Sequence, residues 1–273
     1  MTTPRNISVC SWSLQSEDPV DLGRKMNAIG LGSLQLHLDP FNNTEAPGPA
    51  LAAQGLAISS GMMTTIGEDY TTIESIRMTG GLRPDEHWDA NLAAAHRNAA
   101  LAHALGLDLV TLHAGFIPES PTDPERATFM DRLAIVADAF GQQGVRLGLE
   151  TGQETAETLD AVLKELNHPR LGVNFDPANM ILYGSGDPIE ALERLAPHVM
   201  QVHIKDAAPS DTAGAWGEEV PVGTGTVDWP MFFEILDRDC PDTPLAIERE
   251  AGDDRAGDIR IAAEYIKQFA TDP

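Results

Sequence analysis

Five short apolar segments of the chain each end on a histidine or an acidic residue. These end residues are His113, Glu150, Asp176, His203 and Glu248. Histidine and carboxylate side chains are the groups that most often move protons in catalysis or bind metal ions. Carboxylates are rarely buried without a partner, so their position directly after apolar residues indicates a chemical role.

Three of the five end residues are carboxylates, which suggests a metal site if the segment ends meet in space. Glu150, Asp176 and Glu248 would repel one another and raise their own pKa values unless a cation lay between them. Together with the imidazole of His203 they form a mostly oxygen donor set. Such a set suits one divalent ion, Mn²⁺ as first choice and Mg²⁺ or Co²⁺ as alternatives. Taken singly, Asp176 could simply cap the turn at Pro177, and His203 could be a core histidine.

The segments that must position these residues alternate between strand and helix character. Eight apolar runs read as strands, at residues 7–12, 33–38, 56–62, 109–113, 146–150, 171–176, 199–204 and 245–248. Eight segments between or after them read as helices, at residues 19–29, 49–54, 84–105, 123–141, 155–166, 188–195, 229–236 and 259–269. This alternation favours parallel strands joined by right-handed crossovers, and eight such units can close into a barrel.

The fold class predicted is therefore α/β, a (β/α)8 TIM barrel that occupies residues 1–273 as a single domain. An open doubly wound sheet is the alternative. It is disfavoured because Ser11 to Ser13, directly after the first strand, contain no glycine-rich phosphate fingerprint. In a barrel the site lies at the carboxyl ends of the strands, which is where the five polar residues stand.

Composition and charge exclude several classes of partner. The chain has 18 Lys and Arg against 42 Asp and Glu, for a net charge of −24, so neither nucleic acid nor an anionic membrane is an expected partner. Cys10 and Cys240 cannot form a disulfide framework for 273 residues, and no segment reads as a signal peptide or a membrane helix. A cytoplasmic protein is expected.

Two long segments without regular structure are predicted after the third and seventh strands, at residues 61–81 and 207–228. Loops of this length are uncommon unless they serve a site, so they are candidate lids over a substrate. Gly223 and Gly225 in the second loop are assigned to a turn rather than to phosphate binding. Side chains that could line the pocket or close over it are Trp12, Gln35, His37, Met62, Trp216 and Glu218. Core packing is the first choice for Met62 and an equal alternative for His37.

Five motifs together resemble one known family. They are LGLET (147–151), GVNFDPAN (172–179), VHIKD (202–206), GTGTVDW (223–229) and LAIERE (245–250). In order and spacing they are similar to the xylose isomerase-like TIM barrels of the sugar phosphate isomerase/epimerase superfamily. The resemblance implies that Glu150, Asp176, His203 and Glu248 bind the metal and that the two glutamates act as acid and base. It also implies isomerisation or epimerisation of a sugar or ketosugar through a metal-stabilised enediolate.

Two positions depart from the pattern of the ketose 3-epimerases in that family. Those enzymes carry His three residues after the metal-binding Asp and Arg six residues after the metal-binding His, whereas this chain has Asn179 and Pro209. The stretch around Lys205 is instead similar to inosose dehydratases. A lyase or dehydratase of a keto-cyclitol or 3-ketosugar at the same metal site is therefore the alternative function, with Lys205 as a catalytic residue unless it merely pairs with Asp206 or with nearby carboxylates.

The remaining expectations concern roles and partners. His113 is assigned to acid/base chemistry or substrate binding, and Asn179 joins Trp12, His37 and Trp216 as substrate-binding candidates. The partner expected is a small carbohydrate, and by analogy with the family the protein associates as a homo-oligomer. The DNA-repair branch of the superfamily, with its histidine-rich zinc cluster, and a barrel that has lost catalysis are the two alternatives from other functional classes.

Overall fold

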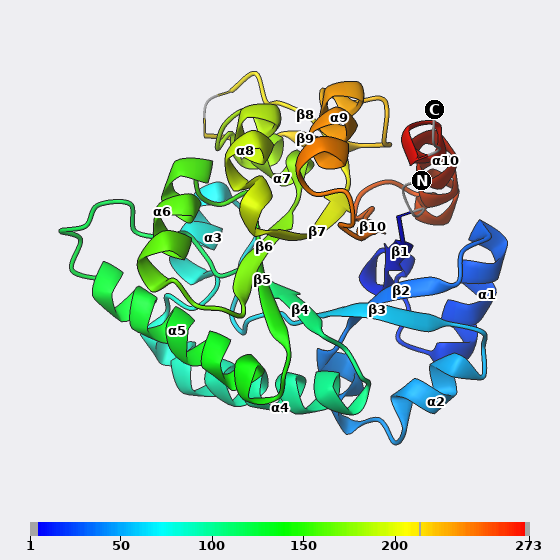
Figure 1. Cartoon of the computed structure of the whole chain (residues 1–273), viewed down its shortest axis with the longest axis horizontal. Coiled ribbons are helices and arrows are strands. Elements are labelled where there is room, and N and C mark those ends of the chain that lie inside the picture. Colours follow the sequence, from blue (N-terminus) through cyan, green and yellow to red (C-terminus); the bar gives the residue numbers. More distant parts are fainter. Residues whose placement is uncertain (1–4, 213, 271–273) are drawn as a thin grey trace.

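Eight parallel strands close into a barrel with helices outside it, which confirms the predicted fold class and excludes the open sheet (Figure 1). The computed structural model describes residues 5–212 and 214–270. Around the barrel the strands follow the order β1-β10-β7-β6-β5-β4-β3-β2. Their bounds are β1 Ile7–Cys10, β2 Ser33–His37, β3 Ala57–Met62, β4 Leu109–Leu112, β5 Arg146–Glu150, β6 Leu171–Phe175, β7 Val199–Ile204 and β10 Leu245–Ile247.

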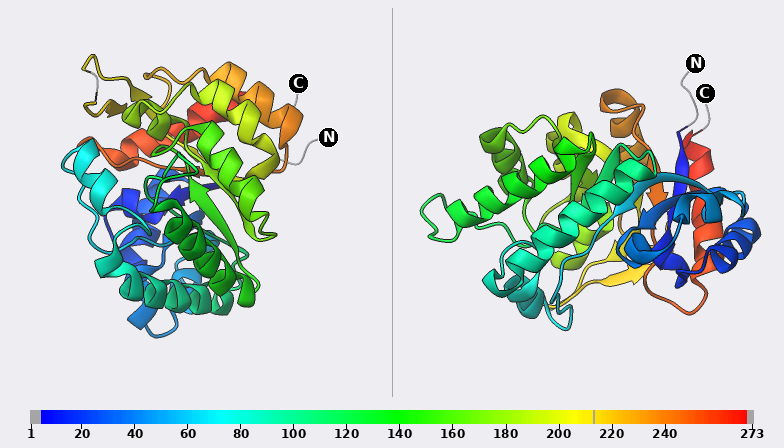
Figure 2. Two further views of the ribbon diagram at one scale, coloured as in Figure 1. Left: turned by 90° about the vertical axis from the view of Figure 1, so that its left-hand side faces the viewer. Right: turned by 90° about the horizontal axis from the view of Figure 1, so that it is seen from below.

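The outer helices follow the strands, and all but the last of them return the chain to the start of the next strand. They are α1 Pro19–Ile29, α2 Pro47–Ala52, α4 Trp88–Ala104, α5 Arg126–Gln142, α6 Ala156–Leu166, α8 Pro188–Leu195, α9 Trp229–Asp239 and α10 Arg255–Ala270. The side views place α10 beside β1, so the last described helix lies next to the first described strand (Figure 2). None of the described helices is long and apolar enough to span a lipid bilayer.

Short polar signals set where these helices begin. The Asp18 side chain accepts a hydrogen bond from the amide of Asp21 at the start of α1, and Pro19 occupies the first helical position. At the start of α8, Asp187 accepts from the amides of Ile189 and Glu190. Capping carboxylates and an N1 proline satisfy or replace the amide donors that a helix leaves free. The sequence therefore predicted the starts of both helices correctly.

Alternation along each strand separates core packing from site chemistry. In β7, Val202 and Ile204 belong to the hydrophobic core that joins strands to helices, whereas His203 between them contacts side chains inside the barrel. Successive side chains of a strand point to opposite faces. Lys205 follows at the same spacing, and like His203 it contacts Glu248.

Two predicted loops need correction, and one helix was missed. The loop predicted at 61–81 contains a helix, α3 Ile73–Thr79, which begins at a capping box formed by Thr72 and Ser75. The segment predicted as an irregular loop at 207–228 contains most of an antiparallel hairpin, β8 Asp206–Ala208 with β9 Glu218–Val220. A further helix, α7 Pro177–Tyr183, was not predicted at all, because two turns provide too few residues for a clear helical period.

Asp206 holds the segment after β7 in place. Its two carboxylate oxygens accept hydrogen bonds from the backbone amides of Gly223, Gly225 and Val227 and from the indole nitrogen of Trp229. A Cβ atom at Gly225 would lie 2.1 Å from Asp206 Oδ1, so only glycine fits there. The two glycines therefore serve this turn, as predicted.

Replacing Asp206 with alanine is expected to lower the free energy of unfolding by about 3 kcal/mol or more, because several bonds to one buried carboxylate are lost together. Urea denaturation followed by circular dichroism measures the change. Asp211→Ala, an exposed position in the same segment, is the control and should change the free energy by less than about 0.5 kcal/mol. Equal stability of the two variants would contradict the anchoring role of Asp206.

Candidate functional site

The barrel brings the four predicted metal ligands together at its carboxyl-terminal rim. His203 Nδ1 lies 3.2 Å from Glu150 Oε1, 3.3 Å from Glu248 Oε2 and 3.8 Å from Asp176 Oδ2. One donor atom from each of the four residues lies within 4.8 Å of all the others. Every one of these side chains is buried, with at most 3% of its surface exposed. The geometry is consistent with a divalent metal site.

Strand register explains why residues far apart in sequence converge. Glu150 is the last residue of β5 and pairs with Asn174 of β6, two residues before Asp176. His203 of β7 pairs with Ala246 of β10, two residues before Glu248. Asp176 caps the start of α7, as predicted, because its Oδ1 accepts from the amide of Asn179; its Oδ2 faces the cluster, and its role as a metal ligand stays a prediction.

The charges of the cluster are only partly compensated by the protein. Glu150 Oε2 and Asp176 Oδ2 are buried without a hydrogen-bond partner among the described residues. Burial raises the pKa of Asp176 to about 6. Burial opposes the charge on His203, but Glu150 and other neighbours outweigh it and raise the imidazole pKa well above its usual range. Bare carboxylate oxygens beside an imidazole are the donor set that a hard divalent ion fits.

Lys205 lies beside the cluster as a buried cation. Its ammonium group donates to Glu248 Oε2 at 3.0 Å, Glu250 Oε2 at 2.8 Å and Asn179 Oδ1 at 3.3 Å. Of the two structural pairings left open for Lys205, the one with Asp206 is wrong, and the one with nearby carboxylates is confirmed. Burial opposes ionisation of Glu248, but Lys205 and His203 outweigh it and hold the pKa of this carboxyl well below its usual range.

Glu250 is a site residue to which the sequence analysis assigned no role. It stands two residues after Glu248, so strand alternation turns both side chains toward Lys205. The motif LAIERE (245–250) already shows the two glutamates at this two-residue spacing. Glu250 is half exposed, which puts it at the rim of the site rather than inside the buried cluster.

His113 and Asn179 flank Glu150. His113 Nε2 lies 3.6 Å from Glu150 Oε1, and its Nδ1 is buried without a partner in the described structure. Asn179 Nδ2 donates to Glu150 Oε1 at 2.9 Å, while its oxygen accepts from Lys205. Asn179 therefore fixes two charged groups as well as lining the cavity beside them.

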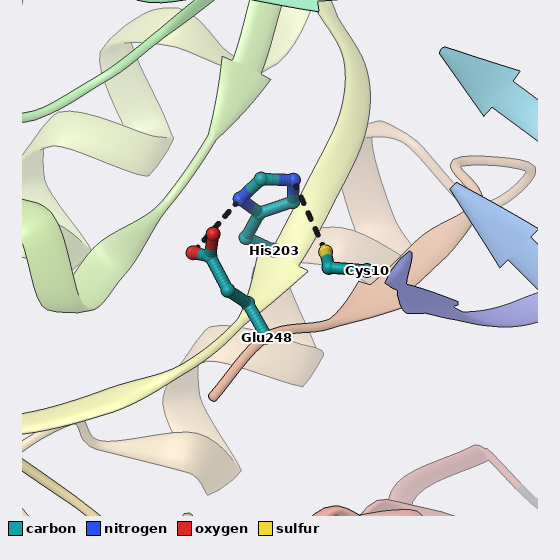
Figure 3. A group of neighbouring side chains, drawn as sticks. All are labelled: Cys10, His203 and Glu248. Atoms are coloured by element: carbon teal, nitrogen blue, oxygen red, sulfur yellow. Dashed lines mark hydrogen bonds and ion pairs between the residues drawn. The ribbon is translucent and has the colours of Figure 1, made fainter. Parts of the chain in front are cut away.

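A second layer of side chains lies on the other face of His203. Figure 3 shows the imidazole between Glu248, which contacts Nδ1, and Cys10, whose sulfur lies 3.8 Å from Nε2. Gln35 Oε1 lies 2.8 Å from the same Nε2. Burial raises the pKa of Cys10 to about 12, so the thiol is protonated at neutral pH. Gln35 is fully buried here, and the expectation that it lines the pocket is wrong.

A cavity of about 510 Å³ opens above the cluster and contains most of the predicted substrate-binding side chains. Trp12, His37, Met62 and Trp216 line it, as does Asn179. The expectation that Glu218 closes over the substrate is not borne out, because Glu219, the next residue of β9, lines the cavity instead. Lining residues that the sequence analysis missed are Thr64, Glu68, Tyr70, Leu182, Tyr183 and Glu219.

The missed residues come from segments with no readable strand end. Tyr183 closes the short helix α7, and Glu68 and Tyr70 lie in the segment before α3. Their contribution depends on how these connections fold back over the rim. Trp12 was identifiable because it directly follows β1, and its indole nitrogen donates to Glu248 Oε1 at 2.7 Å.

Comparison with curated proteins finds partial relatives. An inosose dehydratase of Geobacillus kaustophilus is 30% identical over 135 residues, which cover 43% of this chain and 44% of that protein. The chain spans less than half the length of the curated relatives that it matches. These likenesses leave the activity of this chain open.

Solved structures match over almost the whole chain. A xylose isomerase domain protein of Planctomyces limnophilus superposes with a TM-score of 0.85 at 29% identity, covering 97% of this chain and 96% of that one. A xylose isomerase-like barrel of Mycobacterium smegmatis in complex with magnesium gives 0.75 at 21% identity, covering 98% and 97%. A D-allulose 3-epimerase of Methylomonas sp. in complex with D-allulose gives 0.72 at 16% identity, covering 98% of both chains.

The family itself is shown by the sequence as well as by the fold. The sequence model of the family described as xylose isomerase-like TIM barrel matches residues 24–269, which include all four residues of the cluster. The magnesium and allulose complexes share this barrel, although at their low identity they establish the fold alone. With its closed barrel and its acidic cluster at the rim, this chain belongs to the xylose isomerase-like TIM barrel family.

Proposed function

We propose that the protein is a divalent-metal-dependent isomerase or epimerase of a sugar or ketosugar. The observation that carries the proposal is the cluster of three buried carboxylates and one imidazole, in which two carboxylate oxygens have no donor in the described structure. Buried polar groups are nearly always paired, so unpaired oxygens that converge on one point indicate a bound cation.

Glu150, Asp176, His203 and Glu248 would hold the ion, with Mn²⁺ as first choice. When bound, a divalent ion offsets the negative charge that develops on a carbonyl oxygen as a neighbouring C–H bond is broken. Glu248 lines the cavity, and the other three proposed ligands are buried next to it.

The two glutamates are proposed to move the proton. Glu150 and Glu248 both contact Nδ1 of His203 but carry different neighbours, Asn179 on the first and Trp12 with Lys205 on the second. A substrate carbon between them could lose a proton to one carboxylate and regain it from the other, which exchanges its configuration. His113, whose Nδ1 is free of protein partners among the described residues, would bind or protonate a substrate hydroxyl.

Lys205 supports the second candidate, a dehydratase or lyase of a keto-cyclitol or 3-ketosugar. Its ammonium lies 3.0 Å from Glu248 and lines the cavity. In an elimination, one glutamate takes the proton from carbon, the carbon–oxygen bond breaks, and Lys205 supplies the proton that leaves with the hydroxyl as water. The partial match to inosose dehydratase favours the same candidate.

The other classes have less support. The cluster contains one histidine, unlike the histidine-rich set expected of a phosphodiester-cleaving barrel, and the net charge of −24 opposes DNA binding. A barrel without catalysis would have no need to keep three carboxylates buried together. Association as a homo-oligomer stays a prediction.

Incubation of the Mn²⁺-loaded protein with a panel of ketosugars and keto-cyclitols in D₂O tests the function. Isomerisation or epimerisation would place deuterium on carbon with no loss of water, whereas dehydration would give an unsaturated product. Glu150→Gln and Glu248→Gln are each expected to lower turnover by about 10²-fold or more, the usual loss for a general acid or base. Full activity of either metal-loaded variant would refute the proton-transfer role.

Metal affinity is expected to rise with pH. A metal displaces protons from its ligands, and Asp176 holds a proton up to a pKa of about 6 because of burial, while His203 holds one at higher pH. Below pH 6 the apparent affinity for Mn²⁺ should therefore fall by about tenfold or more per pH unit. Isothermal titration calorimetry between pH 5 and 7.5 measures this slope, and a flat profile would contradict the assignment of these two ligands.

Gln35 is expected to support metal binding from behind His203. For Nδ1 to bind a metal, Nε2 must carry the proton, and Gln35 Oε1 at 2.8 Å is placed to accept it. Gln35→Leu should weaken Mn²⁺ binding by about 10- to 100-fold. Thr111→Val, which removes one of the two acceptors of the Gln35 amide nitrogen and does not touch Gln35 Oε1, is the matched control. Equal affinities of the two variants would show that Gln35 does not set the orientation of His203.

A further inference from the structure

The charged side chains in the wall of the cavity are almost all acidic. The described wall contains four glutamates and one cation, Lys205. Arg249 neutralises one of the glutamates from behind, at 2.9 Å from Glu219. Glu68 accepts from the hydroxyl groups of Thr65 and Tyr70 and from the amide of Gly81, and has no cationic partner among the described residues. The four glutamates are Glu68, Glu219, Glu248 and Glu250.

The single cation has no free donor for a ligand. An ammonium group has three protons, and Lys205 directs them to Glu248, Glu250 and Asn179 at 3.0, 2.8 and 3.3 Å. A divalent ion bound by three carboxylates would carry a net charge of −1 together with those ligands. The metal site therefore adds no net positive charge to the cavity.

The usual protein devices for holding a phosphate are also missing from the described wall. No arginine lines the cavity. The glycine-containing loop has amides that could cradle a phosphate, but Gly223 and Gly225 donate them to the carboxylate of Asp206 at 2.9 and 3.1 Å. Phosphate recognition depends on such amides or on cationic forks, so the described wall lacks the groups that usually bind an anionic substituent.

The other parts of the wall suit a neutral polyol. Trp12, Tyr70, Tyr183 and Trp216 provide aromatic faces, which pack against the C–H faces of a sugar ring. The indole nitrogen of Trp216 is buried without a partner in the described structure, and it is free to donate to a hydroxyl oxygen. Carboxylates of Glu68 and Glu250 can accept from hydroxyl hydrogens.

We propose that the cavity takes uncharged polyhydroxylated substrates, that is, sugars or cyclitols without a phosphate or carboxylate group, and that Glu68 and Glu250 reject the anionic ones. This inference rests on the proposed function, since it names the substrate class of the same site. It is carried by the acidic wall, by the fully engaged Lys205 and by the occupied amides of the glycine loop.

A matched pair of ligands tests the proposal without requiring turnover. Binding of D-glucitol and D-glucitol 6-phosphate to the Mn²⁺-loaded protein is measured by calorimetry at low ionic strength. We expect D-glucitol to bind at least about tenfold more tightly, from like-charge repulsion across the cavity. Glu68→Gln, and more so the Glu68→Gln/Glu250→Gln pair, should reduce this preference by about three- to tenfold. Glu234→Gln on the outer face of α9 removes the same charge far from the site and should leave the preference unchanged.

The outcomes separate this proposal from the function on which it rests. Tighter binding of D-glucitol 6-phosphate, or a preference that does not respond to Glu68→Gln, would overturn the proposal and leave the carbohydrate function standing. If neither ligand binds and no ketosugar or keto-cyclitol is converted, the carbohydrate function is wrong and the proposal falls with it.

Discussion

The repulsion among three buried carboxylates at one end of the barrel is the constraint that organises this protein. Glu150, Asp176 and Glu248 approach one imidazole within 3.2 to 3.8 Å. An arrangement of this kind would be strongly unfavourable without positive charge, because burial removes the screening that water provides. His203 and Lys205 supply part of that charge. The two unpaired carboxylate oxygens mark where the remainder is needed.

The barrel makes this concentration of charge possible by keeping structure and chemistry on different faces of the same strands. Alternate residues of β7 pack into the hydrophobic core, and the residue between them enters the site. The interior below the site is also polar, with Gln35 and Asn174 contacting the far side of His203. The imidazole is thus held from both sides before any ligand arrives, which is the preorganisation that metal sites require.

Charged side chains also link the segment after β7 to the site. Asp206 uses its carboxylate to fold the segment after β7, and in doing so it occupies the amides of a glycine loop that could otherwise bind an anion. Lys205, one residue earlier, is occupied by the glutamates of the β10 end. The resulting wall is acidic and aromatic. The lack of free cationic and amide donors in this wall follows from Lys205 and Asp206, two adjacent residues whose side chains point to opposite sides of one strand end.

The sequence by itself determined the barrel and the four residues of the cluster, because strand ends in a parallel barrel must meet at one rim and their residue types could be read directly. The bounds of β5 and α1 followed from local patterns that neighbouring segments reinforce. Tertiary structure alone decided that Gln35 lies under His203 rather than in the pocket, and that Lys205 contacts Glu250. Those outcomes depend on distances between strands and on connections that fold back over the rim, neither of which has a periodic signal in the chain.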